Sequence, residues 1–331
     1  KKPYAFASCQ KNIKDGVLEK KSYPMLGFPE DKDWILYAAY SDKSMIRNNL
    51  AMDLYGDMGY YSSRNRYVDL YVDGDYKGVY IFMEKYERAD ERINVKKDFE
   101  FALPEEIGYV YKFDKIDYDD PRTWVRDETY CGGPCGDGGC GLGKPIRMED
   151  RQGYEVVYPR PRVDNFEQKK SYLKNFIGNF EKALNTANTE EDFSNIFENY
   201  IDLKSFVDYF IIAELARNTD SYRISMYFTK DVDSRIKCTP VWDFEMGFGN
   251  SRTHGGYATD MWQYSYSGNE PEHNLVGGMN EPHFPIPFWW KKLMTTPCFK
   301  NVLRTRWEEL RLTALSYDNI MSRIDANADI L

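Results

Sequence analysis

PVWDFEMGFGN, residues 240–250, places one acid, Asp243, between two large aromatic residues and follows it with a glycine-containing turn. The preceding run from Ser225 to Trp242, SMYFTKDVDSRIKCTPVW, predicts a β-hairpin of two short β-rich segments around a polar turn. Asp243 would therefore directly follow the second strand. An aspartate at such a position is either a turn residue or a functional carboxylate.

A second acid, Asp220, lies in ARNTDSYRIS, after a predicted helix and before the first strand of this hairpin. Because a hairpin brings its ends together, both carboxylates should open onto one cleft. Two neighbouring carboxylates repel unless a cation or a proton lies between them. Kinases use such a pair, in which one acid activates the attacking hydroxyl and the other holds magnesium on the triphosphate. Alone, each aspartate also fits a helix cap or a turn, but the pair favours function.

The order of the other elements predicts an α+β fold. In the first part, YVDLYVDGDYKGVYIFMEK is a hairpin around Asp73 and Gly74, a dipeptide that suits a tight type I′ turn. Residues 1–103 are expected to form a β-rich lobe, truncated at its start. Residues 104–162 are expected to be an insertion, and residues 163–331 a helical lobe that carries the hairpin with the two acids. In the helical lobe, apolar residues recur at helical spacing, for example at Leu173, Ile177 and Phe180.

Composition narrows the class of protein. The chain has 331 residues, a formal net charge of −9, 42% hydrophobic and 16% aromatic residues, which is typical of a folded globular protein. An acidic chain argues against a nucleic-acid partner, because such proteins usually carry a basic face. The sequence also lacks an apolar run of the roughly 20 residues that a membrane-spanning helix needs. We therefore expect neither nucleic-acid binding nor a membrane span.

Three of the six cysteines lie in CGGPCGDGGCG, residues 131–141. A loop tied by disulfides is the favoured interpretation, because glycine-rich chain cannot order itself through apolar burial. Free thiols and a metal site are the alternatives. The metal reading is the weakest, because no histidine lies nearby and the spacing is not that of a common zinc site.

Several segments, in this order and spacing, resemble the CotH kinases over nearly the whole chain. They are KKPY, YSDKSMIRNNLA, LYVDGDYKGVYIFMEK, NTDSYRISMYF and PVWDFEMGFGN. The resemblance implies a two-lobed atypical protein-kinase-like fold that uses ATP with Mg²⁺ or Mn²⁺. It also implies phosphorylation of Ser or Thr on secreted, surface or coat proteins, so we expect an extracellular, cell-surface or coat location.

The resemblance assigns roles to individual residues. It makes Asp220 the catalytic base and Asp243 a metal ligand. Ser225 stands where kinases usually have a metal-binding asparagine, and its hydroxyl would be a weaker ligand. Candidate nucleotide contacts are Lys2 in the KKPY strand, Lys43 and Arg47 at a helix start, and Glu84 and Lys85 in the MEK segment, which in a kinase connects the lobes beside the adenine.

Other readings stay open at this point. One alternative is a catalytically weak or inactive kinase-fold protein that acts by adhesion or assembly. Two features favour it: Ser225, and the absence of the R-G-N-S-like segment that usually precedes the KK strand. A small-molecule or carbohydrate kinase is a weaker third reading.

Overall fold

The computed structural model describes residues 2–117, 119–125, 152–266 and 286–331. Within them the chain is a mixed α+β protein with antiparallel sheets, as predicted. The helices are α1 (Arg47–Asp57), α2 (Phe166–Thr186), α3 (Glu190–Asn199), α4 (Leu203–Ala216), α5 (Phe288–Leu293), α6 (Pro297–Leu310) and α7 (Tyr317–Ala328). The strands are β1 (Tyr4–Ala7), β2 (Cys9–Lys11), β3 (Leu18–Lys20), β4 (Asp33–Tyr37), β5 (Asn65–Val72), β6 (Asp75–Glu84), β7 (Tyr109–Lys115), β8 (Thr123–Val125), β9 (Gln152–Tyr158), β10 (Met226–Lys230) and β11 (Ile236–Lys237).

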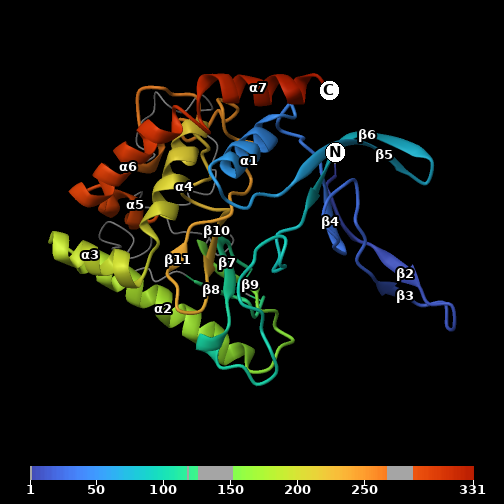
Figure 1. The fold of residues 1–331 in the computed structure, drawn as a ribbon, viewed down its shortest axis with the longest axis horizontal. Helices are drawn as coiled ribbons and strands as arrows, with labels where there is room; N and C mark the ends of the chain where they lie inside the picture. Colours follow the sequence, from blue (N-terminus) through green and yellow to red (C-terminus); the bar gives the residue numbers. More distant parts are fainter. Residues whose placement is uncertain (1, 118, 126–151, 267–285) are drawn as a thin grey trace.

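The first part of the chain forms a four-stranded sheet in the order β1-β4-β6-β5. Its longest hairpin, β5 and β6, turns at Asp73 and Gly74, which have φ angles of 54° and 88°. Both values are positive, as a type I′ turn requires, so the predicted hairpin is confirmed. Figure 1 shows this sheet and the small β2–β3 hairpin on one side of the molecule, away from α2, α3 and α6.

The second sheet has five strands in the order β11-β10-β7-β9-β8. Its centre is β7, which pairs with β10 on one side and with β9 on the other. Both β7 and β9 come from the segment 104–162 that the sequence predicts to be an insertion. The insertion stays a prediction, but both strands lie inside the sheet, where β7 pairs with β10 of the hairpin between the two acids. The cysteine-rich loop, residues 131–141, lies outside the described residues.

Polar caps begin two helices of the second part. Thr189 caps α3 through a reciprocal arrangement with Asp192, in which the Thr189 hydroxyl accepts from the Asp192 N–H and the Asp192 carboxylate accepts from the Thr189 N–H. The FWWKKLM segment forms α5, which is separate from α6. The break falls at Thr296 and Pro297, since Thr296 caps α6 and Pro297 occupies its first turn.

An aromatic core joins these helices to the five-stranded sheet. Trp289 and Trp290 on α5 are buried, and Trp289 lies 6.0 Å from Phe228 on β10 between ring centres. Trp290 packs on Phe206 of α4 at 5.7 Å. The core therefore fixes β10, and with it the two loops that carry Asp220 and Asp243. None of the described helices has the length and apolar character needed to cross a bilayer.

Candidate functional site

Asp220 lies in a tight turn between α4 and β10. Arg217 ends α4 in a left-handed conformation with φ 47°. The Asp220 carbonyl then accepts hydrogen bonds from the N–H groups of Arg223 at 2.8 Å and Ile224 at 3.0 Å. This turn fixes the backbone of Asp220, while its carboxyl remains partly exposed.

Asp243 lies in a second loop, after β11. That strand ends at Lys237, earlier than the predicted hairpin, and the chain passes Pro240, which has no N–H to continue the ladder. The two aromatic neighbours of Asp243 pack in different places. Phe244 is buried in the main core, and Trp242 lies 4.9 Å from the Tyr86 ring. Asp243 itself has φ 63°, a left-handed backbone conformation that non-glycine residues seldom adopt.

The two acids interact electrostatically, as the hairpin argument requires. Burial raises the pKa of Asp243 to about 7, and the negative charges of Asp220, Glu245 and Asp114 add to the shift. Burial likewise raises the pKa of Asp220, although Arg223 and Lys115 pull it down. A carboxyl that is costly to ionise among other carboxylates gains most from a cation.

Ser225 directly precedes β10, and its Oγ donates to Asp243 Oδ2 at 3.4 Å. The structure therefore brings together the three residues predicted for catalysis and metal binding. Carboxylate and hydroxyl oxygens form a hard donor set of the kind that Mg²⁺ or Mn²⁺ accepts, so these side chains fit the implied metal.

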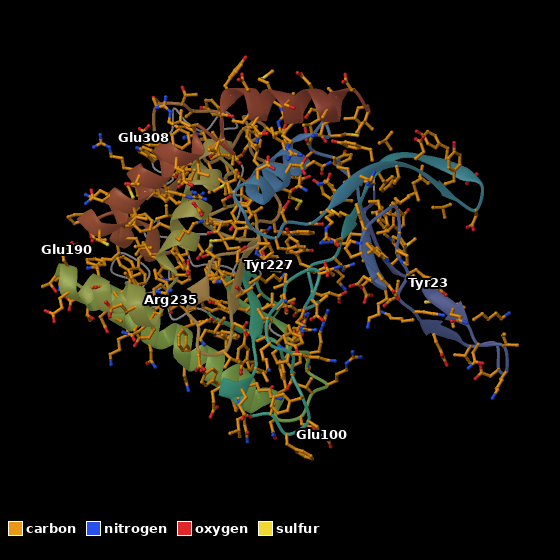
Figure 2. All side chains as sticks on the ribbon, viewed as in Figure 1. Tyr23, Glu100, Glu190, Tyr227, Arg235 and Glu308 are labelled. Carbon is orange, nitrogen blue, oxygen red and sulfur yellow. The ribbon has the colours of Figure 1, made fainter. Side chains whose placement is uncertain are left out.

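Sequence reasoning missed other members of this group. Asp114 is the penultimate residue of β7, in the segment predicted to be an insertion, and Glu245 lies two residues beyond Asp243. Tyr37, the last residue of β4, donates its hydroxyl to the Glu245 carboxylate and so ties the four-stranded sheet to the loop. Burial raises the pKa of Tyr227, and the negative charge of Asp243 adds to this shift. Tyr227 lies near the centre of the molecule in Figure 2. No sequence motif marks Asp114, and its position near the two acids follows only from the pairing of β7 with β10.

Lys43 and Arg47 lie at the start of α1, beside a hollow of about 680 Å³. Its lining also includes Arg252 and Asn250 from the segment after Asp243. The N-terminus of α1 itself is not free for an anion, because Asp42 accepts from the Arg47 N–H at 2.9 Å and also pairs with the Arg47 guanidinium. The predicted anion site is thus a cationic hollow beside the helix start.

Glu84 lies in an internal ion-pair network. Its side chain is fully buried, and its carboxylate pairs with Arg64 at 2.8 Å and lies 3.7 Å from Arg92. Its backbone carbonyl accepts from the hydroxyl of Ser63. A contact between Glu84 and the nucleotide stays a prediction.

The two predicted lysines have different surroundings. Lys85 is half-buried, and its carbonyl accepts from Arg92. Lys2 is exposed just before β1, where its carbonyl accepts from the Tyr80 hydroxyl. Neither lysine is given a role by these contacts, and both stay predictions.

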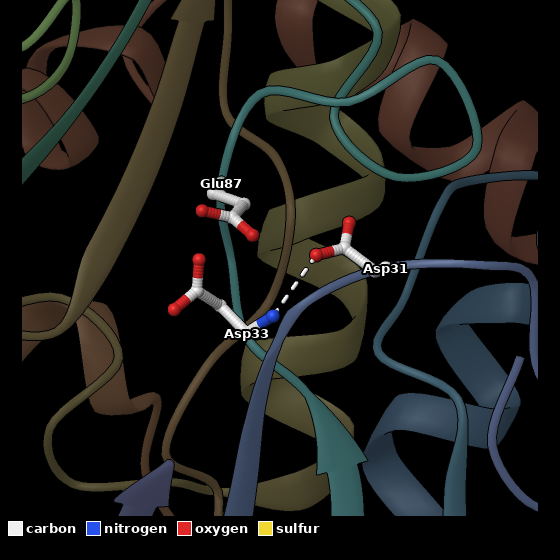
Figure 3. A group of neighbouring side chains, drawn as sticks. All are labelled: Asp31, Asp33 and Glu87. Atoms are coloured by element: carbon white, nitrogen blue, oxygen red, sulfur yellow. Dashed lines mark hydrogen bonds between the residues drawn. The ribbon is translucent and has the colours of Figure 1, made fainter. Parts of the chain in front are cut away.

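A second acidic group lies in the first part of the chain, where oxygen atoms of Asp31, Asp33 and Glu87 all lie within 4.8 Å of one another (Figure 3). Cations already neutralise it: Arg92 lies 3.3 Å from both Asp31 and Glu87, and Lys20 lies 2.8 Å from Asp33. We interpret this group as a salt-bridge network and not as a metal centre.

The site is thus a group of interacting carboxylates beside the ends of a hairpin in an α+β protein. The chain belongs to the CotH family, because the profile described as CotH kinase protein matches residues 1–331, the whole chain. The resemblance seen in the sequence is thereby confirmed. A comparison with curated proteins gave no match.

Proposed function

We propose that this protein transfers the γ-phosphoryl group of ATP to Ser or Thr hydroxyls of secreted, surface or coat proteins. The observation that carries the proposal is that Asp220, Ser225 and Asp243 lie together: Ser225 Oγ donates to Asp243 Oδ2, and the charge of Asp220 adds to the effect of burial on the pKa of Asp243. Family membership supports a kinase-like or spore-coat role at the coarser level.

In this proposal the four-stranded sheet with α1 and the helical part with the five-stranded sheet act as the two lobes of a kinase-like fold. Asp243 and Ser225 would hold the divalent cation, and such a cation supplies neutralisation of the triphosphate charge. Lys43, Arg47 and Arg252, which line the hollow next to Glu245 and Met246, would attract phosphate oxygens of the nucleotide.

Asp220 would act on the acceptor. Its carboxylate would accept a hydrogen bond from the substrate hydroxyl, orient it toward the phosphoryl group and take its proton. Burial raises the pKa of Asp220, and the positive charges of Arg223 and Lys115 oppose this shift and so favour the ionised form that a base needs.

The test is phosphate transfer from γ-labelled ATP by the whole chain, with Mg²⁺ or Mn²⁺ and dephosphorylated casein as the acceptor. We expect labelled phosphoserine or phosphothreonine with wild-type protein and almost none with Asp220→Asn. Failure of wild-type protein to bind nucleotide with either metal would overturn the proposal in favour of a coat or surface protein that acts by adhesion or assembly.

A further inference from the structure

The peptide unit that joins Asp243 to Phe244 is held on both sides by asparagine side chains. Asn218 Nδ2 donates to the Asp243 carbonyl at 3.0 Å. Asn48 Oδ1 accepts from the Phe244 N–H at 2.9 Å. The C=O and the N–H of one peptide are thus fixed by residues 170 positions apart (218 − 48 = 170) in the sequence.

The two asparagines come from different parts of the fold. Asn218 lies two residues before Asp220, and its Nδ2 also donates to Ser221 Oγ at 2.9 Å. Asn48 lies in the first turn of α1 and is only 4% exposed. Fixing a peptide plane restricts ψ of the residue before it and φ of the residue after it, and it favours the left-handed backbone of Asp243.

Two other contacts join α1 and the segment before it to this loop. Arg47 Nε donates to the Phe248 carbonyl at 3.4 Å, and Asn250 Nδ2 donates to the carbonyl of Ser41, which precedes α1, at 3.2 Å. They meet the loop five and seven residues beyond Asp243. The hydrogen bond from Asn48, at Phe244, is therefore nearer to Asp243 along the chain than either of them.

We propose that Asn48 is a positioning residue through which α1 orients the Asp243 carboxylate for its cation. The proposal rests on the proposed function, since it takes Asp243 as the metal ligand. Asn48 acts through the Phe244 N–H and touches neither metal nor nucleotide. A displacement of α1 would move Asn48 Oδ1 away from the Phe244 N–H and leave the Asp243–Phe244 peptide less restrained. The affinity of Asp243 for its cation therefore depends on the position of α1.

The test compares two near-isosteric variants, Asn48→Leu without an acceptor and Asn48→Asp with one. An aspartate accepts from the Phe244 N–H whether it is ionised or protonated. The matched control is Asn49→Leu on the same helix, where Asn49 is fully buried and, among the described contacts, makes no hydrogen bond to the loop that carries Asp243.

Two measurements on the whole chain are needed. Hydrogen exchange without metal should show the Phe244 amide exchanging about 10-fold or more faster in Asn48→Leu, because its acceptor is gone, and near wild-type rates in the other two variants. Titration of ATP with Mg²⁺ should show about 10-fold weaker binding in Asn48→Leu alone, while ATP binding measured with EDTA stays the same in all variants.

The outcomes separate the two proposals. If wild-type protein binds ATP in a Mg²⁺-dependent way but Asn48→Leu binds equally well, the positioning role is wrong and the proposed function survives. If wild-type protein shows no Mg²⁺-dependent binding, the proposed function fails first, and the exchange experiment still decides whether Asn48 holds the peptide. Should Asn48→Leu not fold, Asn218→Ser removes the donor on the other side of the same peptide and should weaken Mg²⁺-dependent binding similarly.

Discussion

Ser225 and Asp243, which flank the β10–β11 hairpin, both have left-handed backbone, with φ angles of 58° and 63°, and their side chains meet at 3.4 Å. Non-glycine residues seldom adopt this conformation, and where they do, strain often marks a functional site. The first three predictions concern these two side chains and the neighbouring Asp220.

Asp243→Asn should abolish most Mg²⁺-dependent ATP binding, because the amide lacks the charge that a cation needs. The same variant should unfold at a higher temperature above pH 7. Its carboxyl has a pKa of about 7 in the folded protein against an ordinary value of 3.8, so wild-type stability falls as pH rises through this range. Thermal unfolding should show a gain of about 1–3 kcal/mol at pH 8 and none at pH 3.5. Equal stability of the two proteins at pH 8 would contradict the electrostatic account.

Asp220→Asn should leave ATP binding with Mg²⁺ within about twofold of wild type, because this acid is proposed to contact the acceptor hydroxyl. Phosphate transfer should fall by about 10²–10⁴, the usual loss when a general base is removed. Calorimetric titration and a transfer assay on the same sample measure both quantities. A similar loss of nucleotide binding in the Asp220 and Asp243 variants would show that their roles are shared or reversed.

Ser225→Asn should strengthen Mg²⁺-dependent ATP binding, since an amide oxygen reaches further than a hydroxyl and asparagine tolerates the left-handed conformation well. Ser225→Ala should weaken binding, because it removes the hydroxyl from Asp243 at a position that stays equally strained. Dissociation constants for the two variants, measured beside wild type, decide the point. Weaker binding in both variants would mean that the site has no room for the larger ligand.

Lys43→Glu and Arg252→Glu should each weaken ATP binding several-fold, more at low salt than at high salt, because both cations line the hollow beside Glu245 and Met246. The control is Lys14→Glu, an exposed lysine in the turn between β2 and β3. Arg47 is unsuitable for this test because it pairs with Asp42. If all three variants bind ATP alike, the hollow is not part of the nucleotide site.

Glu87→Gln should remove a pH dependence of folding. Burial and the charges of Asp31 and Asp33 raise the pKa of Glu87 to about 7, against an ordinary value of 4.5. The contribution of Glu87 to stability is therefore fully present below pH 4.5 and is lost as pH rises through 7. Relative to wild type, the variant should gain melting temperature between pH 5 and pH 8. A difference that does not change with pH would mean that the pairing with Arg92 dominates.

Much of the fold and the centre of the site could be predicted, because the signals were local. The Asp73–Gly74 turn, the Thr189 cap and the two acids flanking a hairpin all depend on residues close in sequence. The strands β7 and β9 could not be placed, because their apolar residues fit a peripheral hairpin as well as a central position. Only pairing with β10 distinguishes the two.

Side-chain partners near the site could not be predicted for a similar reason. Glu84 is the last residue of β6, and the Arg64 that pairs with its carboxylate directly precedes the neighbouring strand β5. Asn48 is one of two adjacent asparagines in a helix, and nothing in the sequence separates the one that reaches Phe244 from the one that does not. When the role of a side chain depends on a backbone group far away in the sequence, no local sequence pattern predicts that role.

The hydrogen bond between Asn48 and Phe244 spans 196 positions of the chain. A ribosome that adds about 5–20 residues per second needs on the order of 10–40 s to cover that interval. During synthesis, the four-stranded sheet and α1 are therefore present for this interval before the loop that carries Asp243 has been made. A polar asparagine on α1 suits this interval, because water can hydrogen-bond to its side chain until the loop with Phe244 has been synthesised. An apolar residue at this position would instead expose one more surface through which a nascent chain can aggregate.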